Sequence, residues 1–268
     1  MTVDMLAGRA RAGRAVILAA LAALLLPLLA VPGAMPARAS SCGLTGAGDA
    51  SSPFLVETAA DLALVGVTCG LDKDYRQTAN ITLGGSNHTP IGVDELSPFV
   101  GTFDGGRFTI TGLRIIDEDV RYGGLFGAVR GGTLTNIRLV DVVIDIEGYA
   151  GGLAGSVVET TIADSTVKGG SVTAEESAGG LVAIVFESFI SNSHTAVDVT
   201  VTGDEPRASG LAGEVALSII VDSSATGDVT STDDGVEFDE GGEIGGLVGF
   251  LDDDSDVVRS FATGDVSA

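Results

Sequence analysis

A five-residue phrase built from glycine around a leucine occurs five times in this chain of 268 residues. The copies read GGLFG, GGLAG, GGLVA, SGLAG and GGLVG, and they begin at Gly123, Gly151, Gly179, Ser209 and Gly245. They follow one another at intervals of 28, 28, 30 and 36 residues. A period of this length indicates a solenoid, in which each repeat forms one turn of the chain.

The residues between the phrases favour strands over helices. Valine, isoleucine and threonine alternate with polar residues there, and a glycine recurs every few positions. Each repeat should therefore be one coil of short strands, stacked on the next at about 4.8 Å through parallel hydrogen-bond ladders. We predict an all-β fold, a parallel β-helix with repeats of about 28 residues. We expect the glycines of the phrase to supply positive φ angles at its corners.

Stacked coils place equivalent residues in columns. The phrase leucines form the first predicted core column, Leu125, Leu153, Leu181, Leu211 and Leu247. A second column contains Leu134, Ile162, Ile190, Ile220 and Val257, and a third contains Val143, Val172, Val199, Val229 and Val266. A polar position between them holds Asn136, Asp164, Asn192, Asp222 and Arg259. This order keeps the two aspartates apart, as stacked charges require.

The first 39 residues have the pattern of a secretory signal peptide. Three arginines precede an apolar run over 15–31, and the small-residue sequence Ala37-Arg38-Ala39 follows it. An uncleaved membrane anchor is the alternative interpretation of this run. The remaining sequence contains no second apolar stretch of membrane length. We therefore expect an exported mature chain, extracellular or at the cell surface, without a membrane span of its own.

Cys42 and Cys69 are the only cysteines. In an exported protein such a pair predicts a disulfide, and closing this loop of about 27 residues would contribute roughly 3–4 kcal/mol. The alternative is a lipoprotein with a lipid on Cys42. We predict three segments, a signal peptide over 1–39, an N-terminal capping region over 40–76 and a β-helix over 77–268.

The composition of the chain limits its fold class and the classes of partner that it can bind. An apolar content of 45% excludes a disordered acidic tail. A formal net charge of −23 disfavours nucleic acid and anionic lipid as partners, because their phosphates would be repelled.

Several stretches carry a family resemblance. These are PFLVETAADLALVG (53–66), YRQTANITL (75–83), TPIG (89–92) and FVGTFDGGRFTITGLRI (99–115). Followed by the glycine-leucine phrases, they resemble bacterial proteins with GLUG-motif repeats. The resemblance implies an exported, adhesin-like protein with a right-handed parallel β-helix. Such repeats also occur beside the catalytic domain of some immunoglobulin A metallopeptidases, but this chain has no HExxH motif.

Two departures from the family pattern are visible. Arg107-Phe108 stands where members often have glycine-histidine, and Ala183 replaces the last glycine of one phrase. Neither change conflicts with the expected fold. The family supplies no catalytic motif, so its contribution is an architecture and a location.

Three hypotheses for function follow. The first is a non-enzymatic, adhesin-like or scaffold protein whose partner is a cell-surface or matrix glycan or protein. The second is a carbohydrate-active β-helix enzyme, a polysaccharide lyase or glycosidase. Its best candidate carboxylates are Asp198, Asp228 and Asp265, at matching turn positions of three repeats. Aspartate is also a favourable turn residue. The third is a spacer from a larger, truncated surface protein, because the sequence stops within a repeat.

Two acidic stretches offer oxygen ligands for calcium, which is the cofactor for which the sequence contains candidate ligands. They are LDDDSD (251–256) and an insertion over 231–243, which we expect to form a loop. Neither follows an EF-hand or a calcium-binding nonapeptide repeat. The two histidines, His88 and His194, lie far apart in the sequence and neither is paired with a nucleophile.

Overall fold

The computed structural model describes residues 41–203, 206–232, 243–252 and 254–268. The predicted signal peptide and most of the acidic insertion lie outside the described residues. The described chain is a parallel β-solenoid in which each complete turn adds a strand to each of four sheets. Every strand pairing within these sheets is parallel, as in the pairs of β10, β12 and β13. The prediction of an all-β parallel β-helix is confirmed.

Sheets 1 and 2 extend over the whole stack. Sheet 1 contains β1 (Phe54–Val56), β2 (Asp74–Gln77), β4 (Thr102–Asp104), β9 (Thr133–Thr135), β13 (Thr161–Ala163), β17 (Phe189–Ser191), β21 (Ile219–Val221) and β26 (Asp256–Val258). Sheet 2 contains β3 (Ile81–Thr82), β5 (Thr109–Thr111), β6 (Arg114–Ile116), β10 (Arg138–Ile146), β14 (Thr166–Ala174), β18 (His194–Val201), β22 (Ser224–Ala225), β23 (Val229–Ser231), β27 (Phe261–Ala262) and β28 (Val266–Ser267).

Sheets 3 and 4 begin later and flank the glycine-leucine phrase. Sheet 3 contains β7 (Tyr122–Gly123), β11 (Tyr149–Gly151), β15 (Ser177–Gly179), β19 (Arg207–Ser209) and β24 (Glu243–Gly245). Sheet 4 contains β8 (Phe126–Arg130), β12 (Ala154–Val158), β16 (Val182–Phe186), β20 (Ala212–Ala216) and β25 (Val248–Leu251). One short helix, α1 (Ala59–Leu62), follows β1 and begins with a capping box between Thr58 and Asp61.

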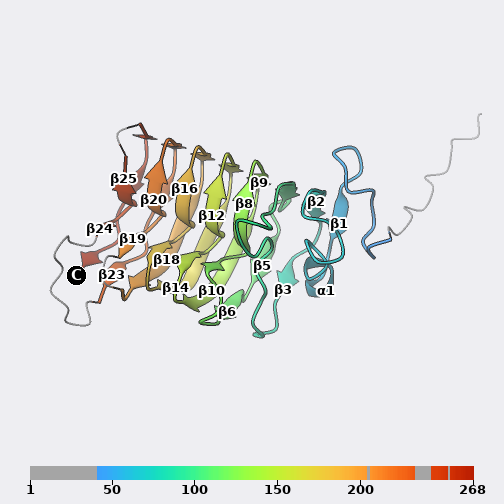
Figure 1. The fold of residues 1–268 in the computed structure, drawn as a ribbon, viewed down its shortest axis with the longest axis horizontal. Helices are drawn as coiled ribbons and strands as arrows, with labels where there is room; N and C mark the ends of the chain where they lie inside the picture. Colours follow the sequence, from blue (N-terminus) through green and yellow to red (C-terminus); the bar gives the residue numbers. More distant parts are fainter. Residues whose placement is uncertain (1–40, 204–205, 233–242, 253) are drawn as a thin grey trace, which may run out of the picture. The chain divides into compact units, whose positions relative to one another are not determined.

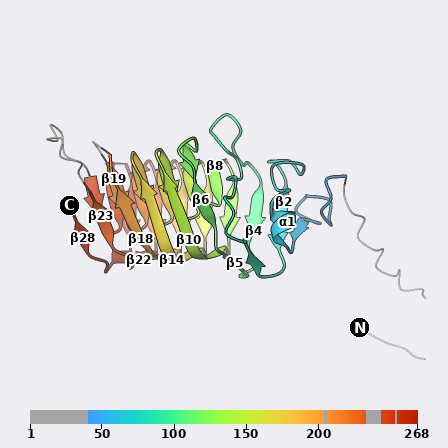
Figure 2. The same cartoon turned by 90° about the horizontal axis from the view of Figure 1, so that it is seen from below.

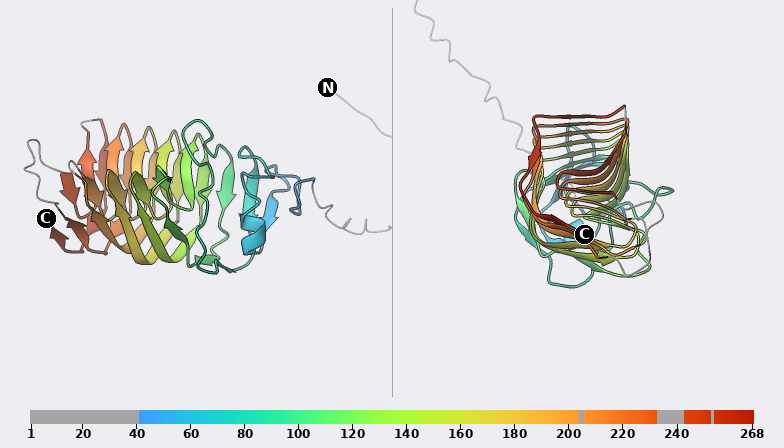
Figure 3. Two further views of the ribbon diagram at one scale, coloured as in Figure 1. Left: turned by 60° about the horizontal axis from the view of Figure 1, so that its bottom comes forward. Right: turned by 90° about the vertical axis from the view of Figure 1, so that its left-hand side faces the viewer.

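The strands of each sheet lie side by side along the stack. Figure 1 shows this for sheet 4, and Figure 2 shows it for β10, β14 and β18 of sheet 2. The end-on view in Figure 3 shows successive turns lying over one another. The ladder of sheet 1 already includes β1 and β2, so the region that we assigned to a cap is built on the same stack.

The core consists of aligned columns. In sheet 1 the register joins the second predicted column residue by residue, from Leu134 to Val257. The same column continues toward the N-terminus through Phe103, Tyr75 and Phe54. The phrase leucines are also stacked, since Leu153 N–H donates to Leu181 O at 2.9 Å, and Leu181 and Leu211 donate in the same way to the leucine of the next turn. The first four are fully buried, and Leu247 in the last turn is half-buried.

The third column differs from the prediction at one position. Ile144 pairs with Val172 and is fully buried, whereas Val143 pairs with Ser171 and is only partly buried. Side chains alternate between the two faces of a strand, so an error of one residue reverses the direction. Ile144 lies 28 residues before Val172 and is the residue that belongs to the third column. The prediction of Val143 at this position was wrong.

The three-residue strands β13, β17 and β21 of sheet 1 each stand between two corners of the same construction. A residue with positive φ comes first, as at Glu159 and Asp164, and a serine or threonine follows it. Ser165 Oγ donates to Ala163 O at 3.0 Å, while Ser165 N–H donates to Ser193 Oγ at 3.3 Å in the next turn. The same pair of bonds continues along the second corner, ending at Ser260. The hydroxyl column thus satisfies corner N–H groups that no strand partner reaches.

The polar position at the second corner forms pairs between turns. Asn192 donates to the carboxylate of Asp164, and Arg259 binds Asp222 through two bonds of 2.6 and 2.7 Å. These bonds hold the pKa of Asp222 below its ordinary value. Asn136, at the start of this column, donates to Asp104 at 3.0 Å. Alternating donors and acceptors therefore remove the repulsion that a column of carboxylates would create.

The glycines of the phrase do not serve the purpose that we expected. Among the phrase positions, Gly124 alone has a φ between +20° and +160°. Of the ten non-glycine residues with positive φ in the described ranges, five are Asn or Asp. Instead, the phrase folds sheet 3 sharply against sheet 4. A Cβ at Gly179 would lie closer than 3.0 Å to Val182 O, and one at Gly180 closer than 3.0 Å to Gly210 O of the next turn. Backbone proximity, rather than backbone conformation, requires glycine here.

We predict that Gly179→Ala lowers the free energy of unfolding by about 1–3 kcal/mol, because its methyl group would overlap a backbone carbonyl oxygen. Gly84→Ala is the matched control, since a Cβ there meets no atom within 4 Å and the φ angle is not positive. Urea denaturation of the two variants measures the difference. Equal stability of both variants would contradict this explanation of the phrase.

Candidate functional site

Cys42 and Cys69 form a disulfide. The bond ties the beginning of the described chain to the connection between α1 and β2, and Cys69 is buried in the core. Disulfides persist in oxidising compartments, so this one indicates an extracellular environment.

The three candidate carboxylates form a ladder on the surface. Asp228 N–H donates to Asp198 Oδ1 at 3.1 Å, and Asp265 N–H donates to Asp228 Oδ1 at 2.9 Å. All three residues lie on sheet 2 or at its edge, and their neighbours Val199, Val229 and Val266 are in register. The structure brings them together, but it uses the first two carboxylates as acceptors for the backbone of the following turn.

A larger acidic group lies at the corner where the chain passes from sheet 2 to sheet 3. Three successive turns contribute to it, and we call it the acidic corner; its members are Asp117, Glu118, Asp119, Asp145, Glu147 and Glu175. They surround a pocket of about 480 Å³ that Thr173 and Thr202 also line. The sequence analysis missed this group. The signal was an acidic stretch a few residues before each of the first three phrases, at 117–119, 145–147 and 175–176.

Two tyrosines adjoin the acidic corner. Tyr122 and Tyr149 stack with ring centroids 5.4 Å apart, and the guanidinium of Arg121 lies 5.4 Å from the centroid of Tyr149. Arg121 also approaches Glu176 at 3.9 Å. A hydrogen bond to Glu176 raises the pKa of Tyr149, and burial raises the pKa of Tyr122, so both phenols are neutral at physiological pH.

This arrangement brings carboxylates of adjacent turns together around one pocket. Glu175 N–H donates to Glu147 O at 3.2 Å, which places these two glutamates on adjacent turns. Adjacent turns are about 4.8 Å apart, and retaining glycosidases hold two carboxyl groups about 5–5.5 Å apart. A basic group and an aromatic pair stand next to them.

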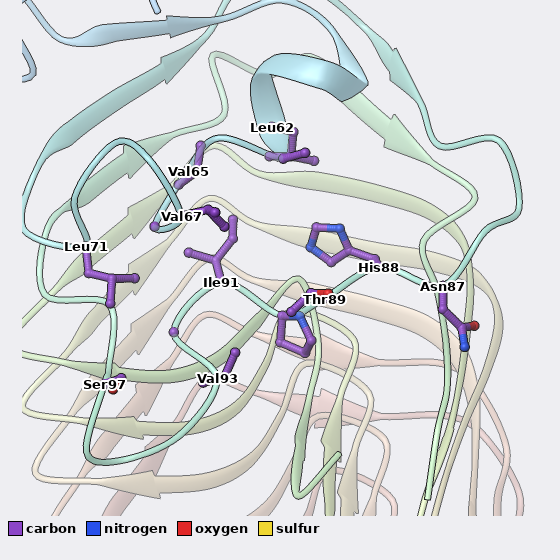
Figure 4. Close-up of a pocket in the computed structure, with 14 residues that line it drawn as sticks. Leu62, Val65, Val67, Leu71, Asn87, His88, Thr89, Ile91, Val93 and Ser97 are labelled. Carbon is purple, nitrogen blue, oxygen red and sulfur yellow. The ribbon is translucent and has the colours of Figure 1, made fainter. Parts of the chain in front are cut away.

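A second pocket lies near the N-terminal end, between the connection after α1 and the loop after β3. We call it the His88 pocket (Figure 4). Its volume is about 490 Å³, and its walls are mostly aliphatic, with Leu62, Val65, Leu71 and Ile91 among them. His88 is the only titratable residue in its lining.

Backbone bonds fix the loop that carries His88. Asn87 binds both backbone groups of Ile116, with its amide donating at 2.8 Å and its carbonyl accepting at 3.3 Å. His88 N–H donates to Arg114 O at 2.7 Å, and Ile91 N–H donates to Leu125 O at 3.0 Å. These bonds fix the backbone on this side of the pocket.

The imidazole of His88 is neutral. Burial lowers its pKa, an effect that the Leu125 carbonyl partly opposes. Within the described residues, Nε2 has no hydrogen-bond partner although it is inaccessible to solvent. His194, in contrast, lies on β18, where its Nδ1 is 2.9 Å from Ser224 Oγ.

The acidic stretch at 251–256 is partly engaged in the stack. The carboxylate of Asp252 accepts the N–H of Leu217 at 3.2 Å and also binds Ser255. Over the part of the chain that the structure describes, no three His, Cys, Asp or Glu side chains are placed to hold a metal ion together.

The chain matches no family model. A segment of 116 residues is 36% identical to a protein of Evansella cellulosilytica named "Putative Gly-rich membrane protein", covering 41% of this chain and 13% of that protein. Another of 105 residues is 33% identical to Halomucin of Haloquadratum walsbyi, covering 37% of this chain and 1% of that protein. The chain thus spans a small fraction of the length of either relative.

A solved structure shares the fold. The crystal structure of a "putative immunoglobulin A1 protease" from Bacteroides ovatus superposes with a TM-score of 0.53 and 17% sequence identity, over 84% of this chain and 86% of that one. At this identity the likeness concerns the fold alone. The β-solenoid and the disulfide define the chain as a disulfide-bonded repeat protein.

In the described ranges, no helix has the length and apolar character needed to cross a membrane.

We predict that the stability of this protein falls with acidification partly through His88. Its pKa in the folded state lies below the ordinary imidazole value of 6.5, so the unfolded chain binds the proton more readily. The stability contributed by the neutral ring is complete above that value and is lost as the pH falls below it. Thermal unfolding at pH 7.5 and pH 5.0 should show a larger drop for the wild type than for His88→Gln. Parallel curves would rule out a contribution from His88.

Proposed function

We propose that this chain is an exported, non-enzymatic β-solenoid of the GLUG-repeat type that acts as an adhesin-like or scaffold module at the cell surface. Its partner on this proposal is a glycan or protein of a cell surface or matrix. The observation that carries the proposal is the ladder of Asp198, Asp228 and Asp265, in which carboxylates at the expected catalytic positions hold neighbouring turns together. The disulfide is consistent with export.

The ladder leads to a test with two sets of variants. Replacing all three aspartates by asparagine keeps an acceptor oxygen and removes like charges on adjacent turns, so we expect an unchanged or higher unfolding temperature. Replacing all three by alanine removes two hydrogen bonds, each worth about 0.5–1.5 kcal/mol, and should lower it.

Binding and turnover are then measured on the same proteins. The full chain and the asparagine variant should bind an array of surface glycans and matrix proteins equally, and neither should release reducing sugar from polysaccharides. Turnover by the wild type that the asparagine variant lacks would replace the scaffold proposal by an enzyme.

Export is tested separately. The full chain, produced in a bacterial host, should appear outside the cytoplasm without residues 1–39 and with Cys42 and Cys69 resistant to alkylation until reduced. Retention in the cytoplasm with two reactive thiols would refute the exported state.

The acidic corner favours a second candidate, a carbohydrate-active site. Its carboxylates converge on one pocket, and Arg121 and two stacked tyrosines stand beside it. On this hypothesis Glu147 and Glu175 act as the pair of carboxyl groups that glycoside cleavage needs.

The second candidate predicts that Glu147→Gln and Glu175→Gln each lower the rate of polysaccharide cleavage at least about 100-fold. Reducing-sugar release measures this rate. Asp198→Asn is the matched control and should retain full activity, because its carboxylate lies in the surface ladder. A wild-type chain without turnover on a broad panel of polysaccharides would reject this candidate.

A further inference from the structure

We infer that the His88 pocket binds a small neutral molecule with an aliphatic body and a single hydroxyl group. The inference does not depend on the surface role proposed above, because it concerns a different part of the molecule. It rests on the walls of the pocket, on one unpartnered nitrogen and on the absence of charge from the lining.

The walls of the pocket are mostly aliphatic, and the polar residues Asn87, Thr89 and Ser97 also line it. Leu62, Val65 and Ile91 form a floor of core residues that are at most 3% exposed. Val67 and Val93 line the pocket nearer to solvent and are 75% and 48% exposed. Exposed aliphatic side chains beside a concave apolar surface are typical of a ligand site.

Among the polar side-chain atoms of the lining, His88 Nε2 is the buried one without a hydrogen-bond partner within the described residues. Most buried polar atoms in folded proteins have one. Figure 4 shows the imidazole among the aliphatic lining residues, between Leu62 and Thr89. A hydroxyl group both donates and accepts, so it can pair with this nitrogen in either tautomer of the neutral ring once a side chain that covers the nitrogen rotates away.

The lining determines the charge of the ligand. Apart from His88 it contains no titratable side chain, so an ionised ligand would lose its hydration without gaining a counter-charge. Three acids that neighbour lining residues in the sequence are already engaged: Asp61 in the capping box of α1, Asp72 with Lys73, and Asp94 with the N–H groups of Leu96 and Ser97. A neutral alcohol therefore fits better than a carboxylate or an amine.

The site is also preorganised. The backbone bonds of Asn87, His88 and Ile91 hold one wall, and Gly66 N–H donates to Cys69 O at 2.7 Å, next to the disulfide, in the other. A volume of about 490 Å³ falls within the range of small-molecule pockets, roughly 300–1,000 Å³.

The test uses 1-hexanol and hexanoate, which share an aliphatic chain and differ in the head group. Titration of the isotope-labelled full chain at pH 7.5, followed by NMR, should show saturable shifts for residues of the pocket, with a Kd for hexanol of the order of millimolar. Hexanoate should bind at least about tenfold more weakly, because its charge must be desolvated.

Three variants locate the site. Val93→Trp fills the pocket from an exposed position and should weaken hexanol binding at least about tenfold, whereas Leu96→Trp, at a residue 93% exposed and outside the lining, should leave it within about twofold. His88→Phe keeps a ring without the nitrogen and should cost about fivefold to tenfold, the value of one hydrogen bond. Absence of saturable binding, equal affinity for hexanoate, or equal effects of the two tryptophan variants would overturn the inference.

Discussion

Each turn of this protein is held to the next by bonds between equivalent positions, and every other feature depends on that alignment. The backbone ladders supply these bonds along the strands. At the corners, where the chain turns and strand pairing stops, serine and threonine hydroxyls continue them: each accepts an N–H from the turn before and donates to its own strand. The apolar columns remain aligned because the polar groups on both sides of sheet 1 are paired in the same register.

The glycine-leucine phrase is the point where this alignment is hardest to achieve. Its leucine enters the core while the flanking glycines lie against the backbone of the same turn and of the next. At Gly179 and Gly180 a Cβ would overlap a backbone carbonyl oxygen, so glycine allows sheets 3 and 4 to approach closely there. Positive φ angles, which a reader of the sequence would assign to glycine first, are instead found at Asn136, Asp164 and Asn192, whose short polar side chains tolerate that conformation.

Repetition made much of the fold predictable. A strict interval identifies stacked positions without any knowledge of the coil, and two of the three core columns follow from it directly. The third failed at Val143 because residue type was weighted above spacing. Both pockets were harder to foresee. The acidic corner is a group only when three turns are stacked, and the His88 pocket is formed by two connections in the N-terminal part, where the chain does not follow the phrase repeat. No periodicity links Leu62 or Val65 to His88, so their meeting depends on the path of individual loops.

Repeat lengths differ mainly at one corner. In sheet 2, Val199 follows its partner Val172 by 27 positions and Val229 follows Val199 by 30. In sheet 3 of the same turns, Arg207 follows Ser177 by 30 positions and Glu243 follows Arg207 by 36. The extra residues therefore enter between sheet 2 and sheet 3, at the edge that carries the acidic corner in earlier turns. In an array of such turns, the segments of variable length would lie along one edge of the solenoid. Substitutions in these segments would change the binding surface along that edge one repeat at a time. The packing of the core would stay the same.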